Sequence, residues 1–295
     1  MKYVGLILII CFTVSCSSSK KVSTVTKASA IEPTLNVSQT DSVKTTTSKV
    51  IKISDSLYVP DTEEEIIIIE KPIIKNEVNA PKAFNHKTFN DLLETHVSEA
   101  GNVNYTGFKD SYKLLRSYIE QMGENLPNDS WSKEEKLAYW INAYNAMTID
   151  LILRHYLVKS IKNIKNPWQQ RYWKLGEKWY NLDEIEHDIL RKMNEPRIHF
   201  AIVCASYSCP KLQNKAFSSS NLEAQLIKAT KEFLKDRERN SISKDELELS
   251  KIFQWFAKDF KQNGSLIDFL NRYSDVKISK NAKKRFKDYN WDLNE

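Results

Sequence analysis

Glycine is scarce in this chain, with 6 residues in 295. Phosphate-cradling loops and dinucleotide-binding turns depend on several closely spaced glycines, and neither fingerprint occurs. The sequence also has no internal repeat. Its long apolar run near the N-terminus is shorter than the ~20 residues that a membrane-spanning helix needs. These absences argue against a nucleotide-binding motif and against a transmembrane helix at that end.

Cysteine is rarer still, with 4 residues. Two of them fall within the first 16 residues, which leaves Cys204 and Cys209 for the rest of the chain. No CxxC or HxxxH spacing supports a metal site built from His187, His199 and a cysteine. We therefore expect neither a metal nor another cofactor.

Charges of both signs are mixed along the chain, which carries a net charge of +6. The densest basic run, at residues 283–285, has no interleaved aromatic residues. Such a run is typical of a solvated surface or of a weak contact with anionic lipid headgroups. We expect no nucleic-acid partner.

The N-terminus has the pattern of a bacterial lipoprotein signal. An apolar run over residues 3–14 ends in a small residue before Cys16, and serines follow. The pattern predicts a signal peptide over residues 1–15 and acylation of Cys16, which would bind the protein to a lipid bilayer. Ser17, in place of aspartate, favours the outer membrane of the bacterial cell envelope, facing the periplasm. An ordinary secretory signal with an incidental Cys16 is the alternative.

A change in composition predicts the domain organisation. Residues 16–83 are rich in Ser, Thr, Val and Lys and cannot bury enough apolar surface to fold, so we expect a flexible tether. All 7 tryptophans lie between Trp131 and Trp291. Residues 84–295 are long enough to close one core without disulfides. We expect a single, mostly helical α+β domain with a small central sheet and a hairpin.

The clearest helix covers residues 132–153. Ser132 and Glu135 form a capping box, and a broad apolar face follows. Asn142 and Asn145 lie one turn apart among apolar residues, so their amides should face protein. Buried amides must be hydrogen-bonded, which predicts that each holds a loop or another side chain in place. A role in polarising a substrate is the alternative.

Two aromatic runs within residues 171–182 flank Gly176-Glu177, a pair typical of a two-residue hairpin turn. A helix over residues 183–193 is expected next, with His187 among acidic and basic neighbours. A solvated, salt-bridged histidine and a catalytic one are both compatible with that pattern.

Residues 196–210 hold the remaining thiols and a histidine. Residues 198–204 are apolar on both faces, which predicts a strand in the middle of a sheet. Alternation along such a strand places His199 and Cys204 on opposite faces, so that they cannot pair. Cys209 follows in a loop, where functional groups usually lie.

Four separated blocks of the sequence resemble domain-of-unknown-function family 547. The blocks are residues 140–145 (WINAYN), 182–187 (LDEIEH) with 189–191 (ILR), 196–210 (PRIHFAIVCASYSCP) and 289–294 (YNWDLN). The likeness spans nearly all of residues 84–295. It implies a bacterial envelope protein or, in plants, a domain joined to a coiled-coil segment. The family has no established reaction, so the resemblance assigns no catalytic residues.

Two functions fit these residues, and we favour a binding or scaffolding module for an envelope protein or a peptidoglycan-type ligand. In that case Cys204 and Cys209 could form a disulfide in an oxidising periplasm. The alternative is a thiol-dependent hydrolase or acyl transferase, with Cys209 as nucleophile. His199 or His187 would be its base and Asn145 an orienting or oxyanion donor. That enzyme would loosely resemble papain-like and transglutaminase-like folds, although these place the cysteine at the start of the core helix.

Overall fold

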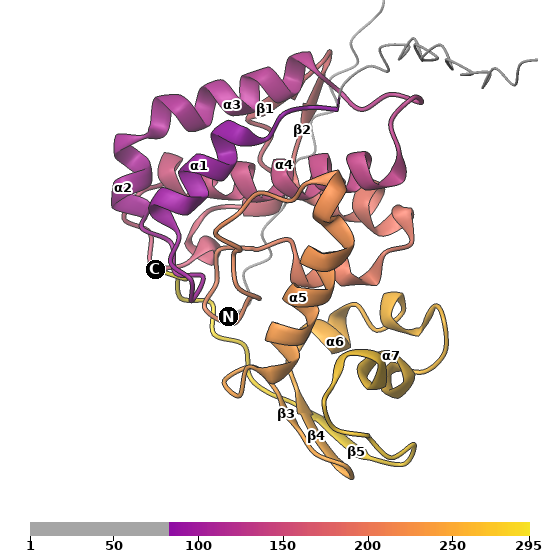
Figure 1. The fold of residues 1–295 in the computed structure, drawn as a ribbon. Helices are drawn as coiled ribbons and strands as arrows, with labels where there is room; N and C mark the ends of the chain where they lie inside the picture. Colours follow the sequence, from indigo (N-terminus) through magenta and orange to yellow (C-terminus); the bar gives the residue numbers. More distant parts are fainter. Residues whose placement is uncertain (1–82) are drawn as a thin grey trace, which may run out of the picture. The chain divides into compact units, whose positions relative to one another are not determined.

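The computed structural model describes residues 83–295. The predicted signal peptide, the acylated Cys16 and the tether up to residue 82 lie outside the described residues and remain predictions. The described residues form an α+β fold of helices with two small sheets, as the sequence predicts (Figure 1). No helix within residues 83–295 is long and apolar enough to cross a membrane.

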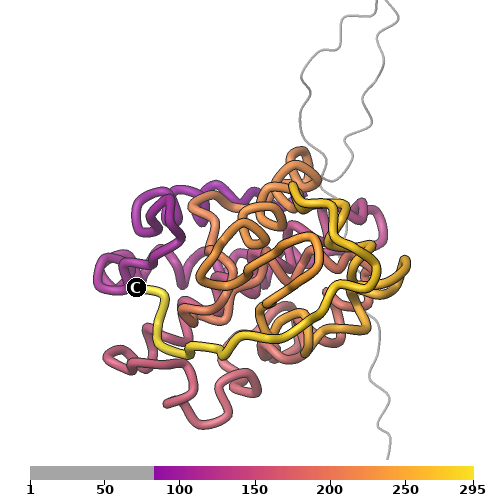
Figure 2. The backbone as a smooth tube through the Cα atoms, turned by 90° about the horizontal axis from the view of Figure 1, so that it is seen from below, coloured from indigo at the N-terminus to yellow at the C-terminus, as the bar shows by residue number. Residues whose placement is uncertain are grey.

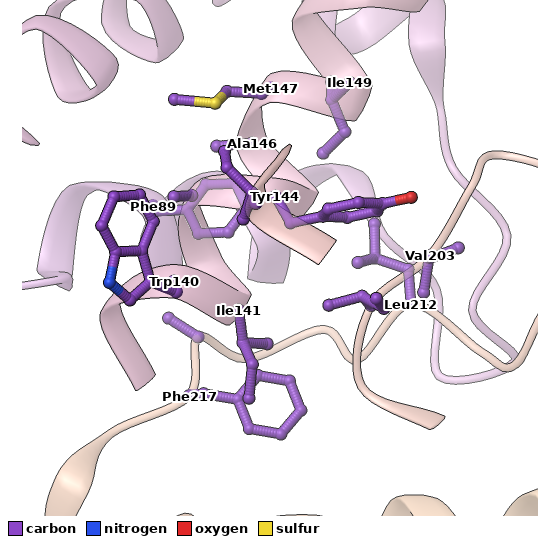
Figure 3. Packing of buried hydrophobic residues seen from close by; sticks show 14 of the residues in the cluster. Phe89, Trp140, Ile141, Tyr144, Ala146, Met147, Ile149, Val203, Leu212 and Phe217 are labelled. Carbon is purple, nitrogen blue, oxygen red and sulfur yellow. The ribbon is translucent and has the colours of Figure 1, made fainter. Parts of the chain in front are cut away.

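The first part of the fold packs around one long helix. Its helices are α1 (Lys87–His96), α2 (Tyr105–Asp110), α3 (Tyr112–Glu124) and α4 (Lys133–Arg154). The predicted capping box of α4 is present, with Ser132 and Glu135 bonding each other's backbone amides. Almost every α4 side chain is buried, and Figure 3 shows Tyr144 and Ile141 among residues from other segments such as Val203. The helix is therefore the central element of the first core.

The predicted hairpin is confirmed. Strands β1 (Trp173–Leu175) and β2 (Lys178–Tyr180) pair antiparallel. Gly176 supplies the left-handed turn position, with φ +57°. The expected helix after the hairpin is irregular: a π-helix over Glu184–Ile189 is followed by a 3-10 helix over Leu190–Met193. Two further 3-10 turns, Ile161–Asn163 and Pro167–Gln169, precede the hairpin.

The predicted central strand at residues 198–204 is wrong. The chain forms a 3-10 helix over Pro196–Phe200, in which the proline occupies the first turn and Glu195 accepts a hydrogen bond from the Arg197 amide. The next backbone groups then bond the Asn145 side chain instead of a neighbouring strand. Strand alternation consequently does not apply here, and it does not separate His199 from Cys204.

The last part of the fold has its own small sheet and core. Its elements are a 3-10 turn (Ser219–Asn221), α5 (Leu222–Lys235), β3 (Ser241–Ile242), β4 (Glu246–Leu249), α6 (Ile252–Trp255), a 3-10 turn (Asp259–Lys261), α7 (Leu266–Tyr273) and β5 (Lys283–Phe286). The strand order is β3-β4-β5, with β4 and β5 parallel. The basic run 283–285 forms most of β5, whose side chains are exposed.

Two clusters of buried apolar residues result, one around α1–α4 and the hairpin, the other around α5–α7 and the three-stranded sheet. The chain after β5 then returns to the first part, as Figure 2 shows. Its Leu293 amide bonds the Lys159 carbonyl at 3.0 Å, and its Asn294 carbonyl accepts from the Val103 amide at 2.7 Å. This C-terminal segment, residues 289–294, lies against the 196–210 segment through the Tyr207 amide, which bonds the Asp292 carbonyl at 2.6 Å.

Candidate active site

A cavity of about 280 Å³ lies where the 196–210 segment, the π-helix, α6 and the C-terminal segment meet. Its walls combine both cysteines, two histidines, two carboxylates and a majority of apolar or aromatic side chains. The lining residues are Tyr144, Trp168, Gln169, Asp183, Glu186, His187, His199, Ile202, Cys204, Cys209, Pro210, Ile252, Trp255, Phe256, Tyr289 and Trp291. Four of the residues singled out from the sequence, both cysteines and both histidines, therefore meet in one place.

Three hydrogen-bond donors converge on the sulfur of Cys209. The Cys204 amide donates to its Sγ at 3.1 Å, the Tyr289 hydroxyl at 3.2 Å and the Ser206 hydroxyl at 3.4 Å. Ala205 lies between Cys204 and Ser206, whose amide and hydroxyl are two of these donors. Its backbone is left-handed, with φ 58°. The Cys209 side chain itself is buried, with 4% of its surface exposed.

These contacts give the two thiols opposite acidities. Burial raises the pKa of Cys209, but the hydrogen bonds from Cys204, Ser206 and Tyr289 outweigh it and lower that pKa to about 6. The hydrogen bond to Cys209 and burial raise the pKa of Cys204 well above its usual value. The hydrogen-bond pattern therefore favours the thiolate on Cys209 and the proton on Cys204. Both cysteines are free thiols here, so the disulfide considered from the sequence is not formed in this structure.

His199 is hydrogen-bonded to the carboxylate of Asp259, which no motif or spacing in the sequence connects with it. Its Nε2 lies 2.8 Å from Oδ2 of Asp259, and its ring stacks on Phe256 with centroids 3.9 Å apart. Arg191 binds both oxygens of the same carboxylate, at 2.7 and 3.0 Å. Burial lowers the pKa of His199. Burial also acts to raise the pKa of Asp259, but the bonds from His199 and Arg191 hold it well below its usual range.

His187 lies closer to solvent than His199. Its Nδ1 is 2.8 Å from Nη1 of Arg191, which donates, and its Nε2 is 3.6 Å from Oδ1 of Asp183. The charged neighbours expected from the sequence are therefore present, although the ring also lines the cavity. The two sulfurs have each other, a backbone amide, a serine and a tyrosine as hydrogen-bond partners, and both imidazoles make their hydrogen bonds elsewhere.

Asn142 and Asn145 have the structural role that the sequence favours. The amide of Asn142 donates to the Phe217 carbonyl at 2.8 Å and accepts from the Phe217 amide at 2.9 Å. Asn145 likewise bonds the Ala201 carbonyl and the Val203 amide, both at 2.9 Å. Because its donor and acceptor are used by the backbone and it does not line the cavity, Asn145 does not fit the oxyanion-donor role. It instead holds the loop that carries Cys204.

Glu186 is a cavity residue that the sequence reasoning missed. It is 8% exposed, and the Tyr144 hydroxyl donates to its Oε2 at 3.2 Å. Burial raises the pKa of its carboxyl to about 7. The available signal was its place beside His187 in the 182–187 block. Tyr289 lies in the 289–294 block. Neither a glutamate nor a tyrosine is diagnostic of a site by its residue type alone.

The unusual acidity of Glu186 predicts a change of stability with pH. The folded protein retains this proton up to about pH 7, whereas an unfolded chain loses it near 4.5. The contribution of protonated Glu186 to the free energy of unfolding is thus fully present below pH 4.5. It is lost as the pH rises through 7, and the free energy of unfolding falls by about 3 kcal/mol. Glu186→Gln should abolish this loss, so the variant gains about that much relative to the parent between pH 4.5 and 8. Urea unfolding of the parent and of Glu186→Gln at pH 4.5 and 8 measures this difference. An equal change of the free energy of unfolding with pH in both proteins would contradict the prediction.

The described residues offer no obvious metal centre, since no group of three or more His, Cys, Asp or Glu within 83–295 is arranged to hold an ion.

Comparison with known proteins finds one family that resembles the part of the chain with most of the site. A family model described as "Protein of unknown function, DUF547" matches residues 128–234, which include α4, the hairpin and the whole 196–210 segment. No curated protein and no solved structure matches the chain. Over residues 128–234, the chain is therefore similar to the DUF547 family, whose function is unknown.

Proposed function

We propose that this protein is a thiol-dependent hydrolase or acyl transferase with Cys209 as its nucleophile. The observation that carries the proposal is the convergence of three hydrogen-bond donors on the Cys209 sulfur at the wall of a cavity. A thiolate is the reactive form of cysteine, and donors aimed at the sulfur favour it over the thiol. A structural cysteine packed among apolar residues would instead keep its proton.

The reaction would proceed by covalent catalysis. The Cys209 sulfur attacks the carbonyl carbon of an acyl donor; an S–C bond forms, and the bond from that carbon to the leaving oxygen or nitrogen breaks. The leaving oxygen or nitrogen takes its proton from water that enters the cavity. Water or an amine then cleaves the thioester and regenerates the thiolate.

This route assigns His199 and Asn145 supporting roles. His199 is bonded to Asp259 and stacked on Phe256, so it fixes one wall of the cavity. Asn145 fixes the loop through two hydrogen bonds to its backbone. Because Cys209 is already ionised near neutral pH, the first step needs no imidazole in contact with the sulfur.

A binding module is the second candidate, favoured by the position of the imidazoles, which make their hydrogen bonds away from both sulfurs. Both candidates place the ligand in the same cavity and differ in whether a covalent bond to Cys209 forms. In either case we propose a lipid-anchored protein of the bacterial envelope, acting on envelope material such as peptidoglycan peptides. That part rests on the pattern of residues 1–16 alone.

Acylation of the full chain by an activated ester tests the enzyme proposal. After incubation with p-nitrophenyl acetate, intact-mass and peptide mass spectrometry should find one acetyl group on Cys209. Cys209→Ala should remain unmodified at that position and should release nitrophenol at the background rate. Cys204→Ala is the matched control: its backbone amide still donates to the Cys209 sulfur, so acylation should persist. Equal nitrophenol release by the parent and Cys209→Ala would reject the nucleophile and leave the binding module.

A further inference from the structure

One wall of the cavity is a continuous set of aromatic rings. Trp255 stacks on Trp291 with centroids 5.8 Å apart, and Tyr289 lies 4.6 Å from Trp291 and 4.8 Å from Trp255. Trp168 meets Trp291 edge-on at 5.9 Å. Trp255 remains 46% exposed although it is large and apolar. The wall therefore presents ring surface that the rest of the protein does not cover.

The lining of the same cavity also carries negative charge. Glu186 and Asp183 both line it, and the one hydrogen bond that the described residues give the Glu186 carboxylate reaches Oε2, from the Tyr144 hydroxyl. The Cys209 thiolate adds a third acidic group. The cationic Arg191 nearby is committed to Asp259 by two hydrogen bonds. An anionic ligand would be repelled by this arrangement, and a neutral one would leave the negative charge of the cavity without a cationic ligand group.

Aromatic faces and carboxylates together are suited to a cation. The electron-rich face of a tryptophan attracts ammonium groups, and several such faces enclose quaternary ammonium ligands in aromatic cages. The same wall already contacts an ammonium group of the protein, because Lys162 Nζ lies over the Trp291 ring, 4.8 Å from its centroid. The free face of Trp255 has no such partner among the described residues.

Resting on the proposed function, we infer that the substrate of Cys209 carries an organic ammonium group, which the cavity holds between Trp255 and the Glu186 carboxylate. An acyl compound with a free amino group or a substituted ammonium meets this requirement. The acyl carbon would lie toward Cys209 and the cationic end toward the aromatic wall. The substrate of the reaction proposed above would therefore be a cation.

A matched pair of probes isolates that charge. Choline and 3,3-dimethylbutan-1-ol have nearly the same shape, but only choline is cationic. Calorimetric titration of the full chain at pH 8 should find choline bound about tenfold more tightly than the alcohol. Equal affinities, or no binding of either probe at millimolar concentration, would overturn the inference.

Three variants locate the site. Trp255→Leu should weaken choline binding about tenfold. Trp179→Leu is the control, since Trp179 is similarly exposed, at 51%, on β2 and outside the cavity; it should bind choline like the parent. Glu186→Gln should remove most of the preference for choline over the alcohol. If Trp179→Leu weakened binding as much as Trp255→Leu, the assigned site would be wrong.

The proposed enzyme activity and the proposed ammonium site can be rejected independently of each other. Acetylation of Cys209 without a preference for choline would reject the ammonium inference and keep the enzyme. A preference for choline without acetylation of Cys209 would reject the enzyme and keep an ammonium-binding cavity.

Discussion

Alkylation of Cys209 by iodoacetamide should rise with pH around a midpoint near 6, the pKa that its hydrogen bonds impose. An ordinary cysteine titrates near 8.5, so at pH 6 Cys209 should contain about 150 times more thiolate. Cys204, whose pKa is raised well above normal, should stay unlabelled over the same range. Labelling of the native protein followed by peptide mass spectrometry, from pH 4.5 to 9.5, distinguishes the two sites.

The pH midpoint of Cys209 alkylation is a better measure of the acidity of this thiol than the rate of alkylation. A thiolate of low pKa is intrinsically a weaker nucleophile, and the Cys209 side chain is 4% exposed, so the limiting rate will be modest. Tyr289→Phe provides the control, because it removes the donor at 3.2 Å and keeps the aromatic ring. Its midpoint should move upward by roughly one pH unit. A parent midpoint near 8.5, or no labelling of Cys209 before reduction, would contradict the assignment, the latter because it would indicate a disulfide.

Replacement of Asn145 by alanine should strongly destabilise the protein. Asn145→Ala leaves the Ala201 carbonyl and the Val203 amide without partners in the core, and each unsatisfied buried group costs about 1–3 kcal/mol. We expect the free energy of unfolding to fall by about 2–5 kcal/mol, measured by urea denaturation. A loss below about 0.5 kcal/mol would show that the loop does not depend on this side chain.

Asn142→Ala is a matched control, since it releases two bonds to Phe217 of similar length in an equally buried setting. It should destabilise the protein to a similar extent. Only Asn145→Ala, however, should also raise the alkylation midpoint of Cys209, because only Asn145 holds the loop that carries the Cys204 amide. An equal change of midpoint in both variants would indicate general loosening of the core instead of local positioning.

Local signals explain what could be predicted from the sequence. The capping box at Ser132 and the glycine at 176 act within a few residues, and both the helix and the hairpin are where these signals indicate. The anchoring role of the two asparagines also follows from a local rule, since an amide on an apolar helix face must find a partner.

The 196–210 segment could not be predicted by such rules. Apolar residues on both faces indicate burial, but they do not identify which groups satisfy the backbone, and here a side chain of α4 does so in place of a strand. The partner of His199 was equally inaccessible, because Asp259 lies 60 positions away in a 3-10 turn with no spacing pattern. Glu186 and Tyr289 lie within the blocks that resemble the family, yet only the fold places them in the lining of the cavity with both cysteines.

The distance along the chain between Cys209 and Tyr289, 80 positions, has a consequence for biosynthesis. A protein is made from its N-terminus, and its earlier segments emerge and begin to fold first. While residues 211–288 are being made, the nascent chain carries Cys209 without the tyrosine donor and without the C-terminal segment that bonds Tyr207. Its thiol is then closer to an ordinary cysteine and largely protonated at neutral pH. The acidic thiolate is acquired only when the C-terminal segment closes over the loop, which protects the unfinished chain from reacting through it.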